Sequence, residues 1–285
     1  MPARNPLRRL LPKRWRGGVV VPVVALSGVI GTVTPLRPGL TLATAAPLLD
    51  KAFRTGGAKA VALLINSPGG SAVQSHLIYS RIRQLAAERK LPVVAFVEDV
   101  AASGGYMIAC AADEIVCDGS SIVGSIGVVG ASFGFTEAMR KLGIERRVYT
   151  AGEHKVMLDP FQPENPDDVA RLKALQMEIH AQFIDLVKTS RGSRLTGPEK
   201  TLFSGEYWIG SKALEYGLVD RIGDVRGVMR ERFGEDVWLP LITPSRGLLG
   251  RFVPGLRAAP VPPVSFADDF VSAIEARAIW SRFGF

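Results

Sequence analysis

The stretch Val93-Val94-Ala95-Phe96-Val97-Glu98-Asp99-Val100-Ala101-Ala102-Ser103-Gly104-Gly105-Tyr106 decides the fold of this protein. It begins as an apolar run of strand-forming residues, which is typical of a strand buried on both faces. It ends in a serine and two glycines, and the residues from Met107 to Ala112 can begin a helix. The stretch therefore predicts a central strand that passes into a helix at Ser103.

Ser103 has two interpretations at this point. A polar side chain between a buried strand and a helix lies at an exposed edge, where the helix N-terminus offers N–H groups to a developing negative charge. That position suits a nucleophile. Serine is also a good helix cap, and this stretch alone favours the cap.

Strands and helices alternate on both sides of this stretch. Apolar runs predict strands at 19–26, 60–65 and 114–117, and a further strand is expected at 145–149. Helical periodicity predicts helices at 42–53, from Ser71 onward, at 136–142, 211–216 and 225–233, and a long helix over 169–189. The buried side of that long helix is expected to carry Leu172, Leu175, Ile179, Phe183 and Leu186. The alternation predicts an α/β fold with a largely parallel sheet.

The chain divides into four predicted parts. Residues 1–17 form a basic arm, and residues 18–236 form the folded domain. Residues 237–264 are a proline-rich linker without periodicity, and residues 265–285 form an amphipathic helix. Its apolar stripe, which is expected to dock on the domain, consists of Phe266, Phe270, Ile274 and Ala278.

The composition excludes several classes of protein. The net charge is +8, but the first 16 residues carry six basic residues and no acidic one, so the remaining chain is nearly neutral. We therefore expect no nucleic-acid binding. Cys110 and Cys117 have neither metal-ligand nor redox spacing and lie in apolar surroundings, so no metal site is expected. No apolar run reaches the length of a membrane span.

A nucleophilic Ser103 needs a base, and few candidates exist. His180 lies in the predicted long helix as a surface or core residue, and His76 is expected to face solvent. His154 and Lys155 are neighbours in a polar loop. The apolar residues after Lys155 can desolvate its amine and favour the neutral base. The residues alone leave both bases open, with a solvated surface charge as the simplest interpretation of Lys155.

The chain resembles the signal peptide peptidase A family, serine peptidases of the ClpP/crotonase-like fold that use a serine–lysine dyad. Five segments carry the resemblance, and they occur in the family's order. They are Asn66-Ser67-Pro68-Gly69-Gly70-Ser71, Ala102-Ser103-Gly104-Gly105-Tyr106, Val123-Gly124-Ser125-Ile126-Gly127-Val128, Lys155 with Asp159-Pro160-Phe161, and Trp208-Ile209-Gly210 with Ala213 and Gly217-Leu218-Val219-Asp220.

The resemblance implies a role for each matching residue. Ser103 is the expected nucleophile and Lys155 the general base. Gly69 and Gly70 are expected to supply one oxyanion N–H group, and Gly104 a second. Ser125 is expected to orient the lysine amine. The implied reaction is peptide cleavage through an acyl-enzyme without a cofactor, and the implied substrates are peptides or unfolded proteins, such as signal-peptide remnants and membrane-protein fragments.

The resemblance also bears on assembly and location. Short family members form rings in which neighbouring subunits can complete the dyad, so we expect a homo-oligomer with shared sites. We expect a cytoplasmic protein whose basic arm can contact the anionic inner face of a membrane. Two other functions stay open: a crotonase-type acyl-CoA hydratase or isomerase, for which Glu98 and Asp99 are the nearby carboxylates, and an inactive scaffold of the same fold.

Overall fold

The structure is a computed structural model that describes residues 18–31, 39–152, 154–244 and 277–284. The basic arm, most of the predicted linker and the first half of the predicted C-terminal helix lie outside the described residues. The strands are β1 (Val23–Ser27), β2 (Val61–Ser67), β3 (Val93–Ala102), β4 (Glu114–Cys117), β5 (Ile122–Gly124), β6 (Tyr207–Ile209) and β7 (Arg221–Ile222). The helices are α1 (Leu42–Phe53), α2 (Ala72–Arg89), α3 (Gly104–Ala109), α4 (Thr136–Leu142), α5 (Pro166–Arg191), α6 (Glu199–Leu202), α7 (Gly210–Glu215) and α8 (Val225–Phe233), with a 3₁₀ turn at Gly192–Arg194.

The predicted α/β fold with a largely parallel sheet is confirmed. The strand order along the sheet is β1-β2-β3-β4-β7, and β5 and β6 lie off this path. All pairs are parallel except β5 with β6. The long strand β3 is central: β2 pairs with one side, while β4 and then β5 pair with successive halves of the other.

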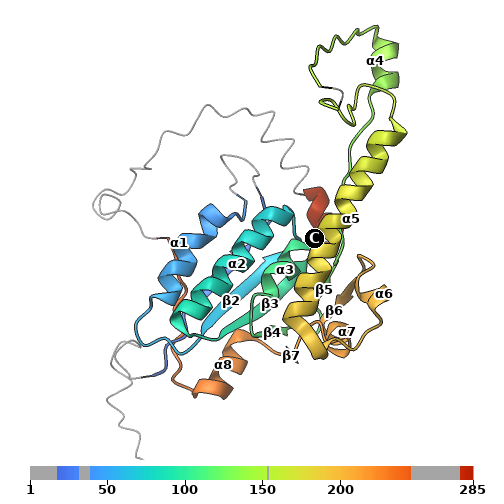
Figure 1. Ribbon diagram of the computed structural model, residues 1–285. Helices are drawn as coiled ribbons and strands as arrows, with labels where there is room; N and C mark the ends of the chain where they lie inside the picture. The colour runs from blue at the N-terminus through green and yellow to red at the C-terminus, as the bar shows by residue number, and fades with distance from the viewer. Residues whose placement is uncertain (1–17, 32–38, 153, 245–276, 285) are drawn as a thin grey trace, which may run out of the picture.

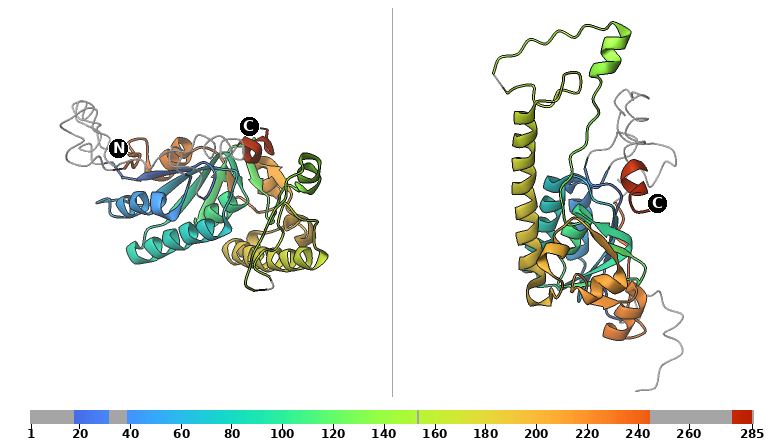
Figure 2. Two further views of the ribbon diagram at one scale, coloured as in Figure 1. Left: turned by 90° about the horizontal axis from the view of Figure 1, so that it is seen from above. Right: turned by 90° about the vertical axis from the view of Figure 1, so that its right-hand side faces the viewer.

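The strands are buried because helices cover the sheet (Figures 1 and 2). The larger core cluster joins α1, α2, α3 and the C-terminal part of α5 to the strands through Leu49, Ile82, Ile108 and Phe183. A second cluster on the opposite face packs Val228 and Met229 of α8 against the alternate strand residues Ala62, Val94, Phe96 and Val116. Burial on both faces explains the continuous apolar run of β3.

Two sequence expectations about residues 145–189 are wrong. Residues 145–149 form no strand and are exposed. The long helix exists, but only Phe183, Val187 and Arg191 are buried on it, whereas Leu175 is 54% exposed. The reason is visible in Figure 1, where the N-terminal half of α5 and the segment carrying α4 project beyond the body of the sheet. An apolar stripe on a helix therefore does not by itself show that the helix packs against the core of its own chain.

The predicted boundary after residue 236 lies too early. The Val21 and Val23 amides donate to the carbonyl oxygens of Trp238 and Pro240, each at 2.9 Å. The Ile242 amide donates back to Val23 at 2.8 Å. Residues 237–242 thus hydrogen-bond to the outer edge of β1, because backbone pairing needs no side-chain periodicity.

A buried ion pair joins the end of α5 to Asp220, the residue before β7. The Arg191 guanidinium is fully buried and donates to both carboxylate oxygens of Asp220 at 2.8 Å. Burial alone would raise the pKa of Asp220, but hydrogen bonds from Arg191 and from the Ile115 amide outweigh it and hold that pKa below its ordinary value. The same arginine donates to the Gly217 carbonyl at 3.0 Å.

Replacing Arg191 by methionine should lower the free energy of unfolding by about 3–5 kcal/mol, because it leaves a partly buried carboxylate without its main partner. Urea denaturation followed by circular dichroism measures this loss. Arg221→Met is the matched control: its pair with Glu231 is exposed, so the unfolding free energy should hardly change. Equal losses in the two variants would contradict this interpretation.

Two further observations concern the whole described chain. None of its described helices is both long and apolar enough to cross a membrane. Cys110 and Cys117 are buried and unpaired, and burial raises the pKa of their thiols to about 11 and about 12. The expectation that both cysteines are buried is confirmed, and neither is a reactive thiolate near neutral pH.

Candidate active site

The site lies at the carboxyl ends of three neighbouring parallel strands. β2 ends before Gly69, β3 ends before Ser103, and β5 ends before Ser125. The register pairs Ala102 of β3 with Gly124 of β5, and Ser103 and Ser125 are the next residues in the sequence. Carboxyl ends of parallel strands meet at one edge of a sheet, which is where ligands bind in such folds.

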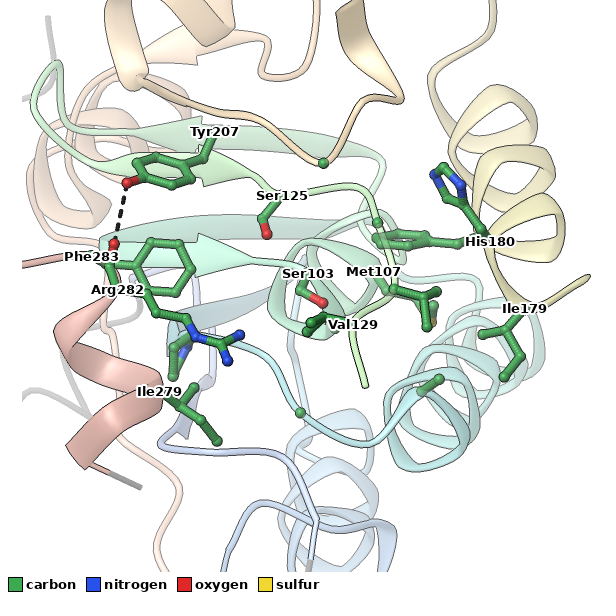
Figure 3. Close-up of a pocket in the computed structure, with 18 of the residues that line it drawn as sticks. Ser103, Met107, Ser125, Val129, Ile179, His180, Tyr207, Ile279, Arg282 and Phe283 are labelled. Carbon is green, nitrogen blue, oxygen red and sulfur yellow. Dashed lines mark hydrogen bonds between the residues drawn. The ribbon is translucent and has the colours of Figure 1, made fainter. Parts of the chain in front are cut away.

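Ser103 has a strained backbone and a hydroxyl that does not cap its helix. Its φ and ψ are 52° and −122°, in a region that residues with a Cβ rarely adopt. Its amide donates to the Gly124 carbonyl at 2.8 Å, and its carbonyl accepts from Met107 at 3.0 Å. It occupies the cap position of α3, yet its side chain makes no capping hydrogen bond. The capping interpretation is therefore wrong, and the hydroxyl faces the pocket (Figure 3).

The pocket beside Ser103 is large enough for several side chains of a peptide. Its volume is about 890 Å³, within the size of typical ligand sites. Most of its lining is apolar or small, with Met107 from α3 and Ile179 from α5 among the larger side chains. Ser125 also lines it, with φ 54° and its amide bonded to the Glu206 carbonyl at 2.7 Å. The structure thus brings Ser103 and Ser125 together (Figure 3).

The three predicted oxyanion glycines differ in what they offer. Gly70 and Gly104 line the pocket. Gly104 opens α3, so its N–H has no acceptor within the helix. The Gly69 amide instead donates to the Ser67 hydroxyl at 3.2 Å. Gly69 is thus not a free oxyanion donor, which corrects that expectation.

Gly69 matters because it has no side chain. It has φ +100°, and a Cβ there would lie 2.8 Å from the Ser103 Cβ and 3.0 Å from the Gly104 nitrogen. Any larger residue must displace the candidate nucleophile. The sequence signal for this steric role is the pair Gly69-Gly70 directly after a buried strand.

Replacing Gly69 by alanine should lower peptide hydrolysis by roughly 100-fold, because shifts near 1 Å at a reacting group cost that much. Gly57→Ala is the matched control: Gly57 has φ +76° but no atom within 4 Å of its added Cβ. The control takes on similar backbone strain without touching the site. Initial rates with a fluorogenic peptide measure both, and an equal loss in both variants would refute the steric role.

Lys155 lies outside this pocket. Its side chain is exposed, it does not line the pocket, and its amide donates to the Gly152 carbonyl at 3.2 Å. It belongs to an extension, residues 132–152 and 154–165, that carries α4 and projects from the body (Figures 1 and 2). Within one chain, the structure therefore does not bring Lys155 to Ser103.

The extension has a small folded cluster of its own. Phe161 stacks on Phe135 with ring centroids 5.6 Å apart, and the Arg146 guanidinium lies 4.8 Å from the Phe161 centroid. Arg146 also pairs with Asp159, and the Pro160 carbonyl accepts from the Phe135 amide at 2.6 Å. The Asp159-Pro160-Phe161 motif thus organises the segment that carries Lys155.

His180 is the pocket residue that sequence reasoning missed. It lines the pocket from α5, and its Nε2 lies 3.0 Å from the Ile126 carbonyl. A carbonyl only accepts, so Nε2 carries the proton and donates it. This contact joins His180 to Ile126 and not to Ser103. His76 is exposed, as expected, and His154 is exposed as well.

The pocket holds a serine whose hydroxyl makes no capping bond, near the N-terminus of α3, and such an arrangement can serve acyl transfer. The model of peptidase family S49 matches residues 86–236, more than half of the chain. The chain therefore belongs to peptidase family S49, and its resemblance to SppA- and SohB-like members is confirmed.

Several curated relatives carry protease names, and one of higher identity carries a different name. Protease 4 of Haemophilus influenzae is 36% identical over 183 residues, 63% of this chain and 29% of that protein. The chloroplastic serine protease SPPA of Arabidopsis thaliana is 34% identical over 166 residues, 58% of this chain and 24% of that protein. A Brucella abortus protein named Na(+)/H(+) antiporter NhaA is 56% identical over 286 residues, 98% of this chain. The chain spans 39% of that protein's length.

Proposed function

We propose that this protein is a serine endopeptidase in which Ser103 is the nucleophile and Lys155 the general base. The observation that carries the proposal is that the Ser103 hydroxyl makes no capping hydrogen bond and lies at a strained turn. Gly70 and Gly104 line the same pocket, which is large enough for part of a peptide. Strain of this kind costs about 1–3 kcal/mol and is typical of functional positions.

The chemistry follows from these groups. Neutral Lys155 takes the Ser103 proton as Oγ attacks the scissile carbonyl carbon, and the Gly70 and Gly104 N–H groups stabilise the oxyanion. The proton then passes to the leaving amine, the C–N bond breaks, and water hydrolyses the resulting ester. Ser125 orients the lysine amine. Signal-peptide remnants and membrane-protein fragments are the substrates that we expect from the family resemblance.

We also propose that two subunits build each site. Lys155 is exposed on the extension rather than in its own chain's pocket. The extension also exposes large apolar side chains, including Phe133 at 80%, Leu142 at 73% and Tyr149 at 90%. Exposed apolar surface of this kind marks an interaction site. A neighbouring copy would cover it and receive Lys155 at its own Ser103.

The alternative hydratase function has less support. A crotonase-type reaction needs carboxylates in the pocket, whereas neither Glu98 nor Asp99 lines it. Asp99 instead accepts a hydrogen bond from Asn66 at 2.6 Å. Turnover separates the candidates: cleavage of quenched fluorescent peptides supports the peptidase, and turnover of acyl-CoA thioesters without peptide cleavage would support the hydratase. If a confirmed oligomer turns over neither substrate, the inactive scaffold is the remaining alternative.

A further inference from the structure

The described C-terminal segment, residues 277–284, forms one wall of the pocket. Ile279, Arg282 and Phe283 line it. Tyr207 of β6 holds the segment: its hydroxyl donates to the Arg282 carbonyl at 3.2 Å, and its ring meets the Phe283 ring edge-on at 5.1 Å. Residues 277–281 are helical, and Ile279 and Phe283 are half-buried, whereas the expected Ala278 is exposed.

This wall stands directly beside the candidate nucleophile. β6 pairs with β5, and the register places Tyr207 opposite Gly124, the residue before Ser125. A segment bound to Tyr207 is therefore fixed relative to the strand ends that carry both serines. Figure 3 shows the Arg282 side chain extending from this segment toward the side of the pocket that holds Ser103.

Arg282 differs in charge from the other residues that line the pocket. Apart from His180, the lining side chains are apolar, small or hydroxyl-bearing. Among the described residues, Arg282 makes no ion pair, and only its carbonyl is used to hold Tyr207. A guanidinium is always charged and presents donors in a fork that fits a carboxylate. Within the described part of the chain, the pocket thus holds a cation without an ion-pair partner, and a carboxylate is the ligand group that suits it.

We propose that Arg282 is a specificity-determining residue that binds a carboxylate of the bound peptide, from an acidic side chain or from a free C-terminus. This inference rests on the peptidase function proposed above and adds a substrate preference to it. The wall residues Ile279 and Phe283 bind the adjoining apolar side chains. Because Arg282 is exposed, the preference should be about fivefold, the upper value for a solvent-accessible ion pair.

Binding to the full-length Ser103→Ala protein tests this without relying on turnover. The probes are fluorescein-labelled, C-terminally amidated apolar octapeptides in which one glutamate or one glutamine is moved through every position. A matching peptide with a free C-terminus distinguishes the second carboxylate source. Fluorescence anisotropy gives each dissociation constant at low salt and at high salt.

We expect glutamate at one position, or the free C-terminus, to strengthen binding about fivefold and less at high salt. Adding Arg282→Gln should abolish this preference, and Arg282→Lys should keep part of it. Arg226→Gln is the charge-matched control, because Arg226 lies on α8 and does not line the pocket. It should retain the full preference.

Equal binding of the glutamate, glutamine and free-carboxylate peptides would overturn the inference, as would the absence of peptide binding. So would a chain ending at residue 276 that binds all peptides more tightly whatever their charge, because the segment would then obstruct the pocket. The wild-type protein could also show a charge preference that depends on Arg282 and yet cleave no peptide. That result would support the role of Arg282 and overturn the proposed peptidase function.

Discussion

Replacing Ser103 by alanine should lower peptide hydrolysis by roughly 10³-fold or more, since it removes the proposed nucleophile and leaves only binding and oxyanion contacts. The fold should persist, because the Ser103 contacts that hold the turn come from its backbone. Initial rates with quenched peptides and a thermal melt measure the two effects separately.

Ser120→Ala is the matched control for this experiment. Ser120 is exposed and its amide, not its hydroxyl, makes the bond to Asp118. Its rate should equal that of the wild type. Hydrolysis that survives in the Ser103→Ala protein would show that another group performs the attack.

Replacing Lys155 by alanine should cause a loss of similar size, and mixing this variant with Ser103→Ala should restore activity. Each mixed interface can join an intact Ser103 from one subunit to an intact Lys155 from its neighbour. Random mixing in equal amounts makes about a quarter of the sites complete, so about a quarter of the wild-type rate should return. The rise in rate is followed after subunit exchange.

The control for mixing pairs Ser103→Ala with a Ser103→Ala, Lys155→Ala double variant, a combination that offers no Ser103. It should stay inactive. Exchange itself is verified by energy transfer between labelled subunits. No recovery despite verified exchange would contradict shared sites and require Lys155 to reach Ser103 of its own chain.

The central part of the fold could be predicted because its rules are local. The apolar run before Ser103 can be satisfied only by a strand buried on both faces. The helix at 42–53 is capped by Thr41, which forms a capping box with Thr44, and this signal lies within a few residues of sequence. Neighbouring residues in the sequence are enough to predict these elements.

The wall at Arg282 could not be predicted in the same way. It depends on a contact between Tyr207 and Arg282, which are 75 residues apart. Of the predicted apolar stripe of this segment, only Ala278 lies within the described residues, and it is exposed. His180 was missed for a related reason. A histidine inside a helix carries no local signal that its imidazole meets the Ile126 carbonyl.

The long helix α5 shows a different limit to periodicity. The helix carries an apolar stripe, but its N-terminal half projects beyond the sheet. Periodicity indicates an apolar face and does not identify the surface that covers it. Met177 is 70% exposed and Leu175 is 54% exposed.

The most direct test of an activated Ser103 is the intact mass of the protein after treatment with a fluorophosphonate, which phosphonylates an activated serine with loss of fluoride. We expect one adduct on the wild-type oligomer and none on Ser103→Ala or Lys155→Ala. Labelling that persists without Lys155 but disappears in His180→Ala would contradict the serine–lysine dyad and make the pocket histidine the base. No adduct on a confirmed wild-type oligomer would contradict an activated Ser103 altogether.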